Sequence, residues 1–116
     1  MRLSEEIRHR TKAYASAVIR LYVSLPRRRR EVEVLGHQLL RSGTSVAAHS
    51  REASRARSNA EFCSKIDGLL QEADEAQLWL ELLRDDCGID TDILLQETGE
   101  LIGIFTSMVS KTRRTL

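Results

Sequence analysis

Two pairs of side chains have the spacing that lets a helix present two metal ligands on one face. His49 precedes Glu52 by three residues, and Glu33 precedes His37 by four, so each pair shares a helix face. Ferritin-like bundles bind metals with a Glu-x-x-His pair from each of two helices, and neither pair here has that order and spacing. The sequence therefore predicts no metal site. We expect His49 to be a hydrogen-bonded side chain at a helix or subunit contact.

The nucleophilic side chains form no catalytic pattern. Cys63 and Cys87 are far apart in the sequence, and no CxxC or HxxxH motif accompanies them, so both are expected to be free, partly buried thiols. The chain contains no Ser-His-Asp order, no glycine-rich phosphate loop and no HExxH motif. We therefore expect a protein that is not an enzyme and uses no cofactor.

Arginine provides a stronger chemical signal, because its planar guanidinium binds phosphate through paired hydrogen bonds. Eight arginines form the candidate nucleic-acid-binding set, namely Arg27, Arg28, Arg29, Arg30, Arg41, Arg51, Arg55 and Arg57. Residues 1–57 hold 13 Lys+Arg and 5 Asp+Glu, a balance of +8, whereas residues 58–116 hold 5 and 12, a balance of −7. This asymmetry indicates either a basic face for RNA or DNA or pairing of basic with acidic helices inside the molecule. Under the second interpretation, the arginines are solvated or paired with the acidic third helix.

Four amphipathic segments must position these side chains. The spacing of apolar residues predicts helices over residues 4–24, 31–57, 59–86 and 91–113. Pro26 ends the first helix, and Ser58 with Glu61 forms a capping-box signature for the third. Gly88 follows the acidic end of that helix as a C-terminal cap. In the second helix, Gly43 predicts a bend or a very close helix contact.

The third segment is the expected centre of the fold. Its apolar and small residues alternate in steps of four and three, so they form one seam along a helix face: Phe62, Ile66, Leu69, Ala73, Ala76, Leu80 and Leu83. Four helices with short connections predict an all-α, antiparallel up-down-up-down bundle. We expect residues 1–116 to form a single domain.

A second apolar set exceeds what a core of this size needs. It contains Leu70, Leu78, Trp79, Leu82, Leu95, Ile102 and Val109. Apolar side chains of this extent, if exposed, mark an interface, so these residues predict a closed homo-oligomer. The chain has no apolar run of about 18 residues and no apolar N-terminal leader. We expect no membrane partner and a cytoplasmic location.

The middle of the chain resembles a bacterial family of four-helix-bundle proteins, named after proteins encoded in intervening sequences of 23S ribosomal RNA genes. The motifs that carry the resemblance are Gln38 with Arg41, the small-residue run 42–48, Glu52, Ser58 with Phe62, the run 72–75, and Trp79 with Leu80. The chain departs from the family pattern at Ala47, where many members have proline, and at His49, where many have asparagine.

The resemblance implies a four-helix bundle that assembles as a homopentamer. It also implies an association with RNA or DNA, because related proteins are basic partners of the reverse transcriptases of diversity-generating retroelements. Two function classes follow: an oligomeric nucleic-acid-binding protein that assists a reverse transcriptase, or a protein–protein assembly scaffold that contacts no nucleic acid.

Overall fold

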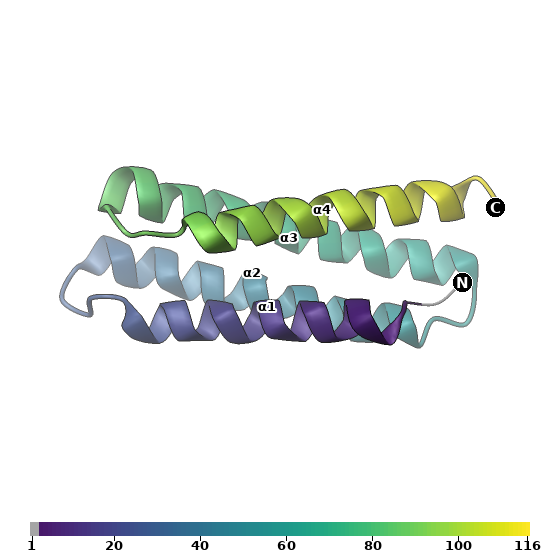
Figure 1. Cartoon of the computed structure of the whole chain (residues 1–116), viewed down its shortest axis with the longest axis horizontal. Coiled ribbons are helices and arrows are strands. Elements are labelled where there is room, and N and C mark those ends of the chain that lie inside the picture. Colours follow the sequence, from purple (N-terminus) through teal and green to yellow (C-terminus); the bar gives the residue numbers. More distant parts are fainter. Residues whose placement is uncertain (1–2) are drawn as a thin grey trace.

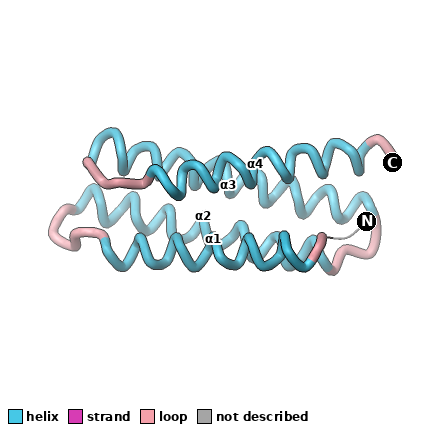
Figure 2. Tube along the Cα trace, in the orientation of Figure 1, coloured by secondary structure: helices cyan, strands magenta, loops and turns pink. Residues whose placement is uncertain are grey.

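The computed structural model describes residues 3–116 and consists of four α-helices with short connections (Figures 1 and 2). The helices are α1 (Glu5–Ser24), α2 (Arg30–Ser54), α3 (Asn59–Cys87) and α4 (Asp92–Arg113). The predicted all-α class is confirmed, and the described residues contain no strand. The boundaries agree to within one residue, except that α2 ends at Ser54 and not at Arg57.

Successive helices run antiparallel, so the predicted up-down-up-down topology is also confirmed (Figure 1). The bundle is 49 Å long and 19 Å in each of the other directions. The α1–α2 and α3–α4 connections lie at one end, and the α2–α3 connection lies at the other (Figure 2). The N-terminal half of α1 therefore lies beside the C-terminal half of α2. Among the described residues, no helix is both long and apolar enough to span a membrane.

The predicted seam of α3 forms the centre of the core. Phe62, Ile66, Leu69, Ala73, Ala76, Leu80 and Leu83 are all buried. They pack with Val18 of α1, Leu39 of α2 and Phe105 of α4 in one apolar cluster. Cys63 and Cys87 are free thiols, as the sequence predicts, and both are fully buried where the sequence predicted partial burial.

The helix ends follow the predicted caps with one difference. Ser58 Oγ accepts a hydrogen bond from the Glu61 amide at 3.0 Å. The Glu61 carboxylate in turn accepts from the Arg57 amide at 3.0 Å, one residue before the amide that a standard capping box uses. Gly88 has a φ of 71°, and this left-handed conformation lets it end α3 without the strain that a side chain would add.

A close helix contact occurs at Gly43, as predicted. A Cβ atom placed on Gly43 would lie 2.8 Å from Val18 Cγ2 and 2.9 Å from Val18 Cγ1. Because these methyl groups belong to a buried, β-branched side chain, they cannot move aside easily. Glycine therefore lets α1 and α2 pack at this distance.

Polar groups join the first helix to the last. Arg10 donates hydrogen bonds to Glu97 Oε1 and to Glu100 Oε1, both at 2.7 Å. The hydrogen bond to Glu97 has the larger effect and the one to Glu100 the next, and both raise the pKa of Arg10. Arg10 also lowers the pKa of Glu100, to which Gln96 adds a second hydrogen bond.

Candidate nucleic-acid interface

The eight predicted arginines occupy three separate places on the bundle. Residues 27–30 lie at the α1–α2 connection, with Arg30 as the first residue of α2. Arg41 lies in the middle of α2, and Arg51, Arg55 and Arg57 lie at or just beyond its far end. Because α2 spans most of a 49 Å long molecule, the two end groups form separate surfaces.

At the first end, Arg29 has a structural role. Its Nη1 donates to the carbonyl oxygen of Cys87 at 2.8 Å, and its Nε donates to Glu31 Oε1 at 2.9 Å. The pKa of Glu31 is lowered, first by a hydrogen bond from its own backbone amide and then by Arg29. Arg29 therefore binds one of the free carbonyl groups at the C-terminus of α3. The side chains of Arg27, Arg28 and Arg30 make no hydrogen bond or ion pair with residues 3–116.

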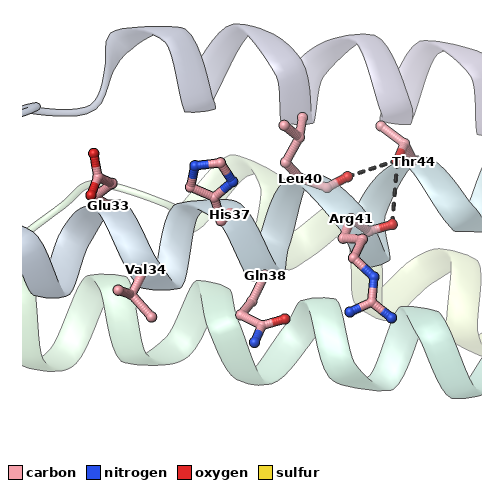
Figure 3. A pocket seen from close by; sticks show the side chains of 7 residues that line it. All are labelled: Glu33, Val34, His37, Gln38, Leu40, Arg41 and Thr44. Carbon is pink, nitrogen blue, oxygen red and sulfur yellow. Dashed lines mark hydrogen bonds between the residues drawn. The ribbon is translucent and has the colours of Figure 1, made fainter.

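Arg41 lies beside a shallow hollow of about 570 Å³ on the outer surface of α2 (Figure 3). All seven lining residues belong to this single helix. Glu33 and His37 point to one side of the helix, whereas Val34 and Arg41 point to the other. His37 Nε2 is hydrogen-bonded to the hydroxyl of Tyr22 at 3.1 Å. Among residues 3–116, no three His, Cys, Asp or Glu side chains lie together as a metal site would require.

The second end contains a larger groove of about 1010 Å³, formed by α1, α2 and the start of α3. We call it the end groove. Its basic residues are Arg8, His9 and Lys12 from α1, Arg51, Arg55 and Arg57 from the end of α2 and the following connection, and Lys65 from α3. Its acidic residues are Glu5, Glu52 and Glu61. Three of the eight predicted arginines thus lie together here, and the other five do not line this groove.

Two of the three carboxylates in the end groove already have partners. Glu52 Oε1 lies 3.5 Å from Lys65 Nζ, and Glu61 accepts the Arg57 amide. In contrast, the side chains of Arg8, Lys12, Arg51, Arg55 and Arg57 form no ion pair or hydrogen bond with the described part of the chain. The predicted alternative, in which Arg51 and Arg55 pair with acidic residues of α3, is therefore not found among residues 3–116. The described lining of the end groove holds six Lys and Arg side chains and three carboxylates, so the end groove has a net positive charge.

Two small hydroxyl-bearing residues, Thr11 of α1 and Ser50 of α2, lie in the buried floor of the end groove. Thr11 Oγ1 donates to the carbonyl oxygen of Arg8 at 3.0 Å. Ser50 Oγ is buried and has no hydrogen-bond partner among residues 3–116. Both residues are small enough to let α1 and α2 approach while keeping the floor polar.

His49 lies beside this groove at the contact between α2 and α3. Its ring packs over Gly68, where an added Cβ would be 3.1 Å from His49 Cε1. His49 Nδ1 lies 3.3 Å from Glu52 Oε1, but the two atoms are not oriented as a hydrogen bond requires. The predicted helix contact is confirmed, whereas the predicted hydrogen bond is absent among the described residues.

The contribution of α1 to the groove was missed by the sequence reasoning. Arg8 and Lys12 are four residues apart, so they share a helix face, and α1 runs antiparallel to α2. Pairing the start of α1 with the end of α2 would have placed them beside Arg51 and Arg55. The sequence therefore contained the information needed to predict this contribution of α1, but using it required combining the antiparallel topology with the positions of the basic residues.

The predicted interface residues lie on α3 and α4 with unequal exposure. Leu70, Trp79, Leu82, Leu95 and Ile102 are half-buried, and Leu78 is 45% exposed. Val109 is only 5% exposed. Its surface is already covered by its own chain, so it offers little to a partner and belongs to the core. Trp79 Nε1 is buried without a hydrogen-bond partner among residues 3–116.

The fold and this groove define a class: a small antiparallel four-helix bundle with an unpaired cationic surface at one end. The family model described as 23S rRNA-intervening sequence protein matches residues 4–107. The chain belongs to this family, as its sequence motifs predict.

A solved structure supports the same assignment. The chain is similar to a crystal structure from Bacteroides thetaiotaomicron described as a protein with unknown function from the S23 ribosomal protein family. The TM-score is 0.82 at 31% sequence identity, and the alignment covers 90% of this chain and 95% of that chain. A search of the curated proteins gave no match.

Proposed function

We propose that this protein is a non-enzymatic homo-oligomer that binds RNA or DNA through the end groove. One observation carries the proposal. Five cationic side chains, Arg8, Lys12, Arg51, Arg55 and Arg57, converge from two helices and a connection, and none of them forms an ion pair with a carboxylate of residues 3–116. Lysine and arginine that contact phosphates release counterions from the nucleic acid, and this release dominates affinity.

The lining of the groove favours recognition of phosphates over recognition of bases. The residues among 3–116 that line it include no Phe, Tyr or Trp, so this lining lacks the large rings on which bases stack in many single-strand-binding proteins. Contacts to phosphate position a nucleic acid but do not read its sequence. We therefore expect similar affinities for unrelated sequences of the same length and strandedness.

A salt-titrated binding assay with a structured RNA and a DNA of equal length tests the proposal. The groove variant Arg51→Gln/Arg55→Gln/Arg57→Gln should weaken binding and make the log–log salt dependence shallower by about 0.7 to 0.9 for each phosphate that the variant no longer binds. The turn variant Arg27→Gln/Arg28→Gln/Arg30→Gln removes the same charge from the opposite end of the bundle. We expect its affinity to fall less, because its three side chains lie at one exposed connection and do not surround a ligand.

Three results separate the possible conclusions. Equal affinity and salt dependence for the groove variant and the parent would show that the end groove is only solvated. A larger decrease in affinity in the turn variant would transfer the site to residues 27–30. No binding of either nucleic acid at low salt would refute the nucleic-acid function.

The alternative function, an assembly scaffold without nucleic-acid contact, is supported by large apolar side chains that are exposed on both halves of the chain. Leu78 on α3 and Ile93 at the start of α4 are both exposed. A partner protein would bind at α3 and α4. Under this alternative, the groove variant would still bind the partner protein, whereas a charged residue in place of Leu78 would abolish that binding.

A further inference from the structure

Ser50 differs from every other serine and threonine of α2 in its hydrogen bonding. Ser42, Thr44, Ser45 and Ser54 each donate to the carbonyl oxygen four residues earlier, at 2.7 to 3.0 Å. This is the usual arrangement for hydroxyl side chains inside a helix. Ser50 Oγ makes no such bond, although Ser50 is 1% exposed. A buried hydroxyl without a partner is destabilising, so a partner from outside the chain would relieve a real penalty.

The position of Ser50 indicates what that partner is. Ser50 lines the end groove together with Arg51 of its own helix, Arg55 at the C-cap of that helix, and Arg8 and Lys12 of α1. Ser50 Oγ is closed to solvent in this structure, so contact with an acceptor in the groove requires a change of the Ser50 χ1 rotamer, after which the hydroxyl can turn its proton toward that acceptor. The acceptor for this hydroxyl would be surrounded by several unpaired cations, so an anion suits the position best. A phosphate group supplies such negatively charged acceptor oxygens.

The two cationic pairs have a regular spacing. Arg8 and Lys12 are one helical turn apart on α1, and Arg51, in the last turn of α2, is four residues before Arg55 at the C-cap. Four residues of an α-helix advance by about 6 Å along its axis. The end groove therefore has a row of cations along each side, and both rows follow the long axis of the bundle.

The width of the groove limits which nucleic acid can reach its floor. Packed helices have axes about 8 to 10 Å apart, so the space between their side-chain rows is narrow. A duplex is too broad to enter it, since the major groove of B-DNA alone is about 12 Å wide. A duplex can contact the cations only from outside, whereas a single sugar–phosphate strand can lie between the two rows.

We propose that the end groove binds a single nucleic-acid strand along its length, with one phosphate accepting a hydrogen bond from Ser50 between the two rows of cations. This inference rests on the proposed function and adds the strandedness of the ligand and a specific contact. The bases face outward, because the described lining of the groove offers no Phe, Tyr or Trp ring for stacking. Single-strand preference then arises from access to the floor and not from base recognition.

Fluorescence anisotropy with an unstructured oligouridylate and a perfectly paired RNA hairpin of equal phosphate number tests this inference. The parent should bind the single strand more tightly. Ser50→Ala should bind the single strand about tenfold more weakly, as expected when a hydrogen bond to a charged group is removed, with little change for the hairpin. Arg51→Gln/Arg55→Gln should make the single-strand salt dependence shallower by about 0.7 for each arginine.

A stability measurement distinguishes a ligand contact from a structural one. Ser50→Ala should unfold at the same or a higher denaturant concentration than the parent, because it removes an unsatisfied buried group and introduces a better helix former. Ser45→Ala is the matched control, since its hydroxyl is committed to the Arg41 carbonyl at 2.8 Å and its affinity should not change.

Two outcomes would overturn the inference while leaving the proposed function intact. One is equal affinity of the parent for the hairpin and the single strand. The other is an unchanged single-strand affinity in Ser50→Ala. If the parent bound neither RNA at low salt, the proposed function would fail as well.

Discussion

Tyr14 shows how one buried hydroxyl joins the first helix to the last. Its oxygen lies 2.7 Å from Thr98 Oγ1, and Thr98 Oγ1 in turn donates to the Leu94 carbonyl at 2.6 Å. Because the single hydroxyl proton of Thr98 is used in that second bond, Tyr14 must be the donor in the first. Burial raises the pKa of Tyr14 to about 12, and the hydrogen bond that Tyr14 donates also favours the protonated form.

Tyr14→Phe should lower the free energy of unfolding by about 1 kcal/mol, the usual net value of a hydrogen bond. The substitution should also change the response to alkali. The Tyr14 pKa is higher in the folded state than the ordinary value of 10.0, so its contribution is full below pH 10 and is lost as pH rises toward about 12. Urea unfolding of both proteins between about pH 8 and pH 12 measures this difference. A parent curve that falls no faster than the variant curve above pH 10 would contradict the assignment.

Among the helices, α1 and α2 are packed closely because of glycine at one position. Gly43 would reduce stability in an isolated helix, but its missing Cβ leaves room for the two methyl groups of Val18. The same residue type in α4, Gly103, has nothing within 4 Å of a Cβ placed on it. These two helical glycines therefore predict opposite effects for one substitution.

Gly43→Ala should destabilise the protein by about 1 to 3 kcal/mol, the usual cost of overpacking a core. Gly103→Ala should stabilise it by up to about 1 kcal/mol, since alanine has the higher helix propensity and meets no neighbour. Thermal unfolding of both variants checks the pair. A stabilising Gly43→Ala would mean that α1 and α2 can separate without penalty, and the second substitution Val18→Ala should partly rescue a destabilised Gly43→Ala.

The helices themselves were predictable because each one carries a strong period of apolar residues and most carry a recognisable cap. The end of α2 was not. Arg55 leaves the helical conformation, and its amide bonds to the Glu52 carbonyl at 3.0 Å, because the chain must reverse before Ser58 can cap α3. The end groove was only half predictable for a related reason. The helical period predicts on which face of α2 each arginine lies. Which face of α1 lies beside those arginines depends on how the packed helices are rotated about their axes, and the period of one helix does not determine that rotation.

At the scale of the whole molecule, the exposed apolar side chains favour assembly. We propose a closed homopentamer, preferred because the family resemblance implies it, with contacts through Leu78 and the half-buried residues beside it on α3 and α4. Leu78→Glu should shift the mass measured by light scattering at micromolar concentration from that of a pentamer toward that of a single chain. A buried unpaired charge at an interface is costly, whereas the same charge in solvent is not.

Val23→Glu is a suitable control for assembly, because Val23 is 62% exposed and belongs to α1. Its mass should match that of the parent. A parent that is monomeric at micromolar concentration would refute the oligomer, and equal dissociation by both variants would move the interface away from α3 and α4.

The charge of this protein is separated by the fold as well as by the sequence. The basic half of the chain forms the α1–α2 pair and the acidic half forms the α3–α4 pair, which lie on opposite sides of the bundle in Figure 1. A net charge of +1 therefore conceals a large electric dipole across the short axis of the molecule. In the field of a polyanion, such a dipole exerts a torque that turns the α1–α2 side toward the strand before contact. Salt should then slow association more than it speeds dissociation, because ions screen this orienting field at a distance.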